Sequence, residues 1–180
     1  MKKLENRRCK KLVGSMLAAL LAVCLVVMPL YADETESVDR SKMGGFSEYE
    51  YDDGQAIALA QLMWAEARGC AKREQSLVAW TVLNRVDVCY SGYSDFWSIL
   101  TQPNQFAYWS SCPYEEYEHE IAIDVLQRWA AEKDGVEDSG RTLPEGYLYY
   151  CGDGQHNWFS TDGNGRELWF GLGDPYEDAG

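Results

Sequence analysis

Glu66 is the residue of this chain whose type and surroundings most suggest chemistry. It stands in the stretch MWAEARGC, four residues after Leu62 and three after Met63, so helical spacing puts it on an apolar stripe. Gly69 is expected to end that helix, which leaves Glu66 in the last turn, near the negative end of the helix dipole. Partial burial and the dipole both disfavour the ionised form, so the carboxyl is expected to keep its proton near neutrality. A protonated carboxyl of this kind is a general acid for cleavage of a glycosidic bond.

The alternative for Glu66 is a structural ion pair with a nearby arginine, Arg68 or Arg85. A helical pattern alone supports this interpretation as well as it supports catalysis.

Three helices are expected to position these groups. The first begins behind Asp52 or Asp53 and ends before Gly69. The second covers residues 74–86, and the third covers residues 115–135, in each case because apolar residues recur at helical spacing. An aromatic loop, residues 93–114, separates these two helices. Residues 146–151 and 166–172 are predicted strands, joined by a Gly- and Asp-rich loop at 152–165. Helices followed by a small antiparallel sheet predict an α+β domain.

The chain is expected to be exported. In residues 1–32, six basic residues precede an apolar run from Leu12 to about Leu30, the pattern of a signal peptide or an N-terminal membrane anchor. Residues 33–52 are acidic and short of large aliphatics, which predicts a flexible linker, and residues 53–180 form one folded domain. We therefore expect an extracytoplasmic location, secreted or anchored at the outer face of the cytoplasmic membrane.

The net charge and the number of cysteines narrow the class of protein further. The chain has 16 basic and 29 acidic residues, and its first 32 residues hold six and one of these, which leaves 10 basic against 28 acidic. Nucleic acid is therefore excluded as a partner, because phosphate binding needs a basic face. Cys70, Cys89, Cys112 and Cys151 are an even number in an oxidising compartment, so two disulfides are expected, with the connectivity open. The alternative is a Cys-His nucleophile that uses His119 or His156.

Three motifs carry a family resemblance. WAEARG at 64–69, LVAWTVLNRV at 77–86 and QPNQF at 102–106 together resemble the cell-wall hydrolase family typified by spore cortex-lytic enzymes. The later segments YLYY, HNW and LWFG fit the family more loosely, and the resemblance spans roughly residues 56–171. It implies a lysozyme-like fold, mainly helical with a small antiparallel sheet, and cleavage of the glycan strands of peptidoglycan, with Glu66 as the catalytic glutamate. Family members usually show a second acid where this chain has Cys70.

The mechanism that the resemblance implies is lytic transglycosylation. Glu66 would protonate the oxygen between N-acetylmuramic acid (MurNAc) and N-acetylglucosamine (GlcNAc), and would then take a proton from the muramoyl C6 hydroxyl, giving a 1,6-anhydro product. Hydrolysis with a second acid, Asp95 or Glu115, stays open. So do a Cys-His peptidase or amidase acting on the peptide stems, and a non-catalytic glycan-binding domain of the same fold.

The aromatic loop is expected to form one wall of a cleft. The resemblance favours Gln105 and Phe106 as substrate-binding residues, ahead of Tyr108 and Trp109, whose rings offer stacking faces. The opposite wall is predicted to carry Tyr149, Asn157 and Trp158, with Tyr150 beside them, whereas Trp80, Trp129 and Tyr147 are expected to pack in the interior.

No metal or cofactor is expected. The segment from Asp162 departs from a calcium loop, because Arg166 stands where an oxygen ligand belongs. Two histidines 37 residues apart, without a ligand-spaced cysteine pair, do not build a zinc site. The expected partner is the peptidoglycan glycan strand, approached by a monomer that touches the membrane only through its N-terminal segment.

Overall fold

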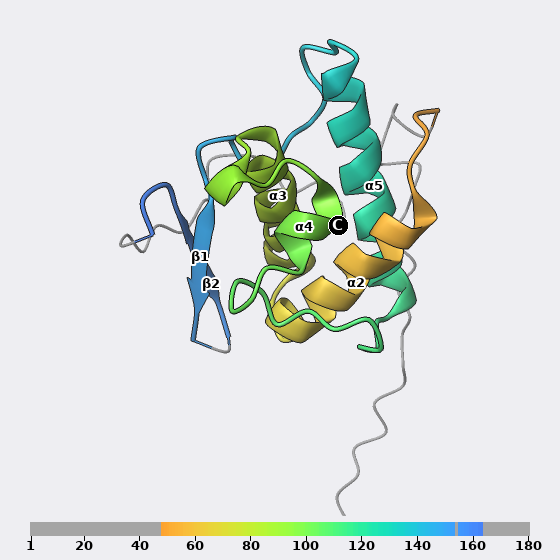
Figure 1. Cartoon of the computed structure of the whole chain (residues 1–180). Helices are drawn as coiled ribbons and strands as arrows, with labels where there is room; N and C mark the ends of the chain where they lie inside the picture. Colours follow the sequence, from red (N-terminus) through yellow and green to blue (C-terminus); the bar gives the residue numbers. More distant parts are fainter. Residues whose placement is uncertain (1–47, 154, 164–180) are drawn as a thin grey trace, which may run out of the picture. The chain divides into compact units, whose positions relative to one another are not determined.

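The computed structural model describes residues 48–153 and 155–163, all within the unit Ser37–Gly180 (Figure 1). In this part of the chain the elements are α2 (Asp53–Ala67), α3 (Lys72–Asp87), the 3-10 helix η1 (Tyr90–Gly92), α4 (Phe96–Leu100), α5 (Glu116–Lys133), β1 (Tyr149–Gly152) and β2 (Asn157–Ser160). Four α-helices with one two-stranded antiparallel sheet are compatible with the α+β class expected from the sequence.

The predicted helix boundaries are confirmed to within a few residues. Asp52 caps α2 by accepting a hydrogen bond from the Gln55 N–H at 2.7 Å, and α2 ends at Ala67, two residues before Gly69. The helix α5 begins with a capping box, in which Glu118 Oε2 accepts the Glu115 N–H at 2.8 Å.

The core forms where α2, α3 and α5 pack against one another. Leu62 of α2, Trp80 of α3 and Ile121 of α5 are fully buried there, so the prediction that Trp80 packs in the interior is confirmed. The short helix α4 contacts α3, and the β-hairpin contacts α3 through β1, beside which it lies in Figure 1. The helix α3 therefore contacts both α4 and the hairpin.

The second strand differs from the prediction. β2 lies at Asn157–Ser160, inside the segment expected to be a loop, and pairs with β1 so that Tyr150 faces Phe159 and Cys151 faces Trp158. The fully buried Phe159 ring ties this strand to the core, which outweighs the turn-forming residues around it. The strand predicted at 166–172 lies outside the described residues. The segment 93–114, expected to be a loop, contains the short helix α4.

The expected disulfides are not formed in the described part of the chain. Cys70, Cys89, Cys112 and Cys151 are all free thiols there. Cys70 lies beside Asn157, Cys112 is buried near Glu118, and Cys89 and Cys151 are exposed. An even cysteine count favours bridges, but the fold gives each of these thiols different neighbours.

The leader predicted at 1–32 lies outside the described residues, as does most of the linker predicted at 33–52. At its described end, the carbonyl of Tyr49 accepts a hydrogen bond from Gln127 Nε2 of α5 at 3.2 Å. Among the helices that the structure describes, none has the length and apolar character to cross a membrane.

Candidate active site around Glu66

Glu66 lies one residue before the end of α2, and its side chain is partly buried. Its Oε1 atom accepts a hydrogen bond from the backbone N–H of Ala107 at 2.5 Å. Five residues earlier on α2, Gln61 donates from Nε2 to the carbonyl of Ser110 at 3.1 Å. These two bonds hold the aromatic loop along α2 and bring its QPNQF motif next to Glu66.

Neither nearby arginine binds Glu66 in the described part of the chain. Arg68 donates to the carbonyl of Trp64 at 3.4 Å, and its guanidinium lies 4.5 Å from the centre of the Trp64 ring. Arg85 donates from Nε to the carbonyl of Leu148 at 2.7 Å and from Nη1 to Gln105 Oε1 at 3.3 Å. The interpretation of Glu66 as an arginine-paired structural acid is therefore wrong.

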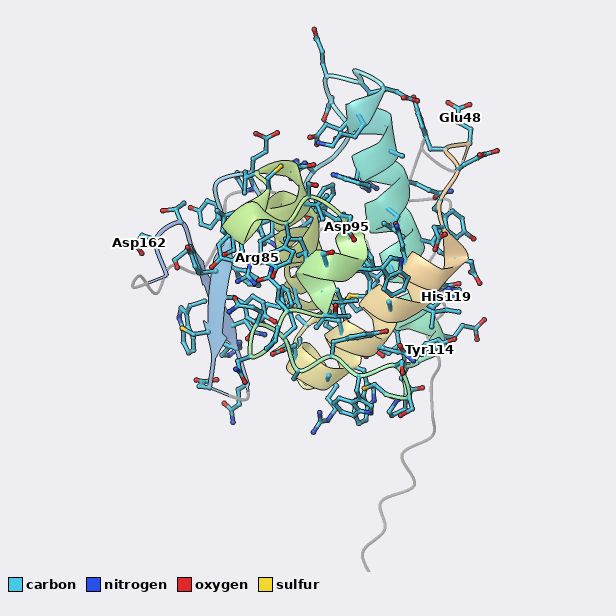
Figure 2. All side chains as sticks on the ribbon, viewed as in Figure 1. Glu48, Arg85, Asp95, Tyr114, His119 and Asp162 are labelled. Atoms are coloured by element: carbon cyan, nitrogen blue, oxygen red, sulfur yellow. The ribbon has the colours of Figure 1, made fainter. Side chains whose placement is uncertain are left out.

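Arg85 joins three segments around Glu66 (labelled in Figure 2). Only 5% of this residue is exposed, and burial lowers its pKa from the usual value. Its guanidinium lies 4.6 Å from the Tyr90 ring centre, 4.7 Å from that of Phe106 and 5.8 Å from that of Tyr149. A cation stacked between aromatic rings contributes to stability even where its hydration is lost. Arg85 thus fixes the aromatic loop and the start of β1 relative to α3.

Tyr150 is the hairpin residue whose pKa depends on Glu66. Its ring packs against Phe106 and Phe159, at centroid distances of 6.3 Å and 5.8 Å. Burial, and then the negative charge of Glu66, raise the pKa of Tyr150 well above its usual value. Its hydroxyl oxygen is buried and has no hydrogen-bond partner among the described residues. A neutral phenol therefore faces the carboxyl group.

The predicted residues of the aromatic loop come together beside this pair. Gln105 is exposed and accepts from Arg85, while Phe106 and Tyr108 are half-buried and Trp109 is exposed. A hollow of about 450 Å³ lies along the loop, and we call it the aromatic groove. Its lining includes Trp97, Gln102, Asn104, Phe106, Tyr108 and Trp109. Glu66 is not part of this lining, but Ala107, which holds Glu66, stands between Phe106 and Tyr108.

The residues predicted for the opposite wall are placed differently. Neighbouring residues of a strand point to opposite faces, so Tyr149 and Trp158 lie on the face of the hairpin away from Tyr150. The Tyr149 ring packs edge-on against Tyr90 at 5.8 Å. Asn157 is only 3% exposed, and its side chain donates to the Cys70 sulfur at 3.5 Å. Of the residues predicted for this wall, Tyr150 lies near Glu66, whereas Asn157 makes a structural hydrogen bond to Cys70.

The two acids considered for water activation serve as helix caps. Asp95, labelled at α4 in Figure 2, accepts the Ser98 N–H at 2.9 Å, and hydrogen bonding to the Ser98 side chain and then to its backbone lowers the pKa of Asp95. The Glu115 side chain caps α5. Glu118 in the same capping box is fully buried, and burial raises its pKa to about 7, but a sealed carboxyl cannot meet a polymer.

The thiol and histidine pattern argues against a Cys-His nucleophile. Burial, followed by the charges of Glu74 and Asp153, raises the pKa of Cys70 to about 11, whereas a nucleophilic thiol needs a lowered pKa. The Nδ1 atom of His156 lies 3.3 Å from Glu74. His119 lies 3.4 Å from Asp53. Its ring also packs against that of Tyr114, and both residues are labelled in Figure 2.

One group of carboxylates in the described part of the chain has the spacing of a cation site. Asp87, Glu132 and Glu145 bring their oxygens within 4.8 Å of one another. Arg141 lies 3.2 Å from Asp87 and 2.7 Å from Glu132, and Lys133 lies 2.7 Å from Asp87. Arg141 and Lys133 thus pair with two of the three carboxylates, so we assign Asp87 and Glu132 to an ion-pair network. Most of the loop that begins at Asp162 lies outside the described residues.

Comparison of the chain with protein-family models, with curated proteins and with solved structures finds no match.

Proposed function

We propose that this chain is an exported enzyme that cleaves peptidoglycan glycan strands at the MurNAc–GlcNAc bond, with Glu66 as general acid and then general base. The observation that carries the proposal is the setting of Glu66. Its carboxyl group is oriented by the Ala107 N–H, faces the neutral Tyr150 hydroxyl and has no arginine partner among the described residues. The resemblance of the WAEARG, LVAWTVLNRV and QPNQF motifs supports the same assignment, because the three motifs are neighbours in the fold. Arg85 binds Gln105, and Ala107, which follows QPNQF directly, binds Glu66.

The chemistry follows from this geometry. Ala107 engages Oε1, which leaves Oε2 to carry the proton. Glu66 would donate that proton to the glycosidic oxygen while the bond to the muramoyl anomeric carbon breaks. The carboxylate would then accept the proton of the C6 hydroxyl, whose oxygen bonds to the anomeric carbon and closes the 1,6-anhydro ring. One carboxyl group therefore returns to its starting state within the cycle.

The helix caps favour transglycosylation over hydrolysis. An inverting hydrolase needs a second carboxylate to activate water, and a retaining one needs it as a nucleophile. Asp95 and Glu115, the acids considered for that role, are both bound to backbone N–H groups at helix starts. The intramolecular C6 hydroxyl needs no such partner.

The test compares wild type with Glu66→Gln on purified peptidoglycan, by loss of turbidity and by pelleting of bound protein. We expect both proteins to bind and Glu66→Gln to lose at least about 100-fold in rate, the usual contribution of a general acid. Glu137→Gln, which changes an exposed carboxyl beyond α5, is the matched control and should clear the suspension as wild type does. Clearing by Glu66→Gln at the wild-type rate would contradict the proposal. Binding without clearing by any variant would support a non-catalytic glycan-binding domain.

A further inference from the structure

We infer that the aromatic groove binds the neutral, N-acetylated sugars of a glycan strand, with the indole of Trp97 as a stacking platform. This inference rests on the proposed function and deepens it, since it assigns the sugar-recognition surface next to Glu66. Trp97 belongs to α4 and was not among the residues predicted from the sequence.

The groove is uncharged on a strongly acidic chain. No Asp, Glu, Lys, Arg or His lines it, although the chain beyond residue 32 holds 28 acidic and 10 basic residues. Its lining consists of aromatic rings together with amide, hydroxyl and small apolar groups. A charged ligand would lose hydration there without meeting an opposite charge, whereas a neutral polyhydroxylated ligand would find both stacking faces and hydrogen-bonding groups.

Trp97 is fixed in place although 45% of it is exposed. Its carbonyl accepts hydrogen bonds from the N–H of Thr101 at 3.0 Å and from the Thr101 hydroxyl at 2.7 Å. Its ring packs edge-on against Phe96 at 5.1 Å. A Cβ atom added at Gly54 would lie 3.8 Å from its Cζ2 atom, so the indole rests close to the first turn of α2. An aromatic ring held in this way can receive a sugar with little further loss of side-chain entropy.

An unpaired amide donor adds a second indication of a ligand. The Nε2 atom of Gln102, a residue of the groove lining, is buried and has no hydrogen-bond partner among the described residues. A buried donor without a partner is costly, so a rotation that lets it meet a ligand carbonyl is favourable. The acetamido group of an N-acetylated sugar supplies such a carbonyl.

One residue of the aromatic loop links the groove lining to the proposed acid. Phe106 and Tyr108 both line the groove, and the N–H of Ala107 between them binds Glu66. A strand seated in the groove would therefore leave it beside the carboxyl group.

The test uses the GlcNAc tetramer as ligand and titration calorimetry as readout, in the Glu66→Gln background so that binding is measured without turnover. We expect Trp97→Ala to weaken binding at least 10-fold and Trp97→Phe to restore part of it. Tyr93→Ala is the matched control, because Tyr93 is 46% exposed and does not line the groove, and it should bind as the background protein does. Equal thermal unfolding midpoints would show that each variant is folded.

A second ligand separates recognition from charge attraction. The fully deacetylated glucosamine tetramer is cationic, so the acidic chain alone would bind it more tightly than the acetylated one. The inference predicts the opposite order at about 0.15 M salt. Tighter binding of the deacetylated tetramer, no sugar binding, or unchanged binding by Trp97→Ala would overturn it. The failure of this inference can be told apart from that of the proposed function. If wild type binds the sugar but does not cleave peptidoglycan, only the proposed enzyme activity is contradicted. If wild type cleaves peptidoglycan but Trp97→Ala binds the sugar unchanged, only the role of the groove is contradicted.

Discussion

Glu66 is a carboxyl group oriented by a backbone donor and not by a cation. An arginine partner would hold a carboxyl in its ionised form and so remove the proton that a general acid must give. The Ala107 N–H fixes the direction of the group without adding a counter-charge. Glu118 shows the contrast, since it is a fully buried acid whose carboxylate caps the start of α5.

Tyr150→Phe tests the partner of that carboxyl group. The substitution keeps the ring between Phe106 and Phe159 and removes the hydroxyl that faces Glu66. A hydrogen bond that this hydroxyl gives to the carboxyl group during the reaction would contribute about 0.5–1.5 kcal/mol, so kcat/KM should fall about 2- to 10-fold. Initial rates of peptidoglycan clearing measure this change. Tyr149→Phe, on the other face of the hairpin, should stay close to wild type. A wild-type rate for Tyr150→Phe would remove the hydroxyl from the mechanism.

The sequence predicts the position of Glu66 better than its partners. The Ala107 N–H is a backbone donor, which nearly every residue type has, so the sequence does not reveal that it binds Glu66. Tyr149 and Tyr150 are identical neighbours, and only the register of the hairpin decides which of them faces Glu66. The role of Arg85 depends on rings from three segments that meet only in the folded chain.

At the scale of elements, long helices with caps were predictable and short elements were not. Asp52 marks the start of α2 because a side-chain cap is a local signal, and α2 ends two residues before Gly69. β2 is four residues long, and its ladder partner and the burial of Phe159 are non-local. Glu74 of α3 accepts the Asn157 N–H at 2.6 Å and so fastens β2 to the helix, a contact between residues 83 positions apart.

The capping box of α5 predicts a pH dependence of stability. Burial raises the pKa of Glu118 to about 7 from 4.5, so between these pH values the folded chain holds a proton that the unfolded chain has released. The contribution of Glu118 to stability should therefore be fully present below about pH 4.5 and be lost as pH rises to about 7, by roughly 1–3 kcal/mol. Glu118→Gln keeps the cap and cannot ionise, so its unfolding midpoint should lack this component. Denaturant unfolding of both proteins from pH 4 to 8 measures the difference, and parallel profiles would contradict the prediction.

At the scale of the whole molecule, one core built by α2, α3 and α5 holds the fold without a covalent bridge among the described residues. The chain beyond residue 32 should then titrate four thiols when unfolded without reductant, and reductant should not move its thermal midpoint. Because its pKa is raised to about 11, Cys70 should alkylate more slowly at pH 8 than the exposed Cys89 and Cys151. Thiol titration and peptide mass mapping check both points. Fewer than four thiols would restore the disulfide prediction.

Mass spectrometry of the fragments released from purified peptidoglycan tests the central claim most directly. We expect soluble muropeptides ending in 1,6-anhydro-N-acetylmuramic acid from wild type, and none from Glu66→Gln, which differs by one ionisable group. Products with reducing N-acetylmuramic acid ends would show that water, and not the C6 hydroxyl, attacks the anomeric carbon. Free stem peptides from wild type, or anhydro products from Glu66→Gln, would contradict the role assigned to Glu66.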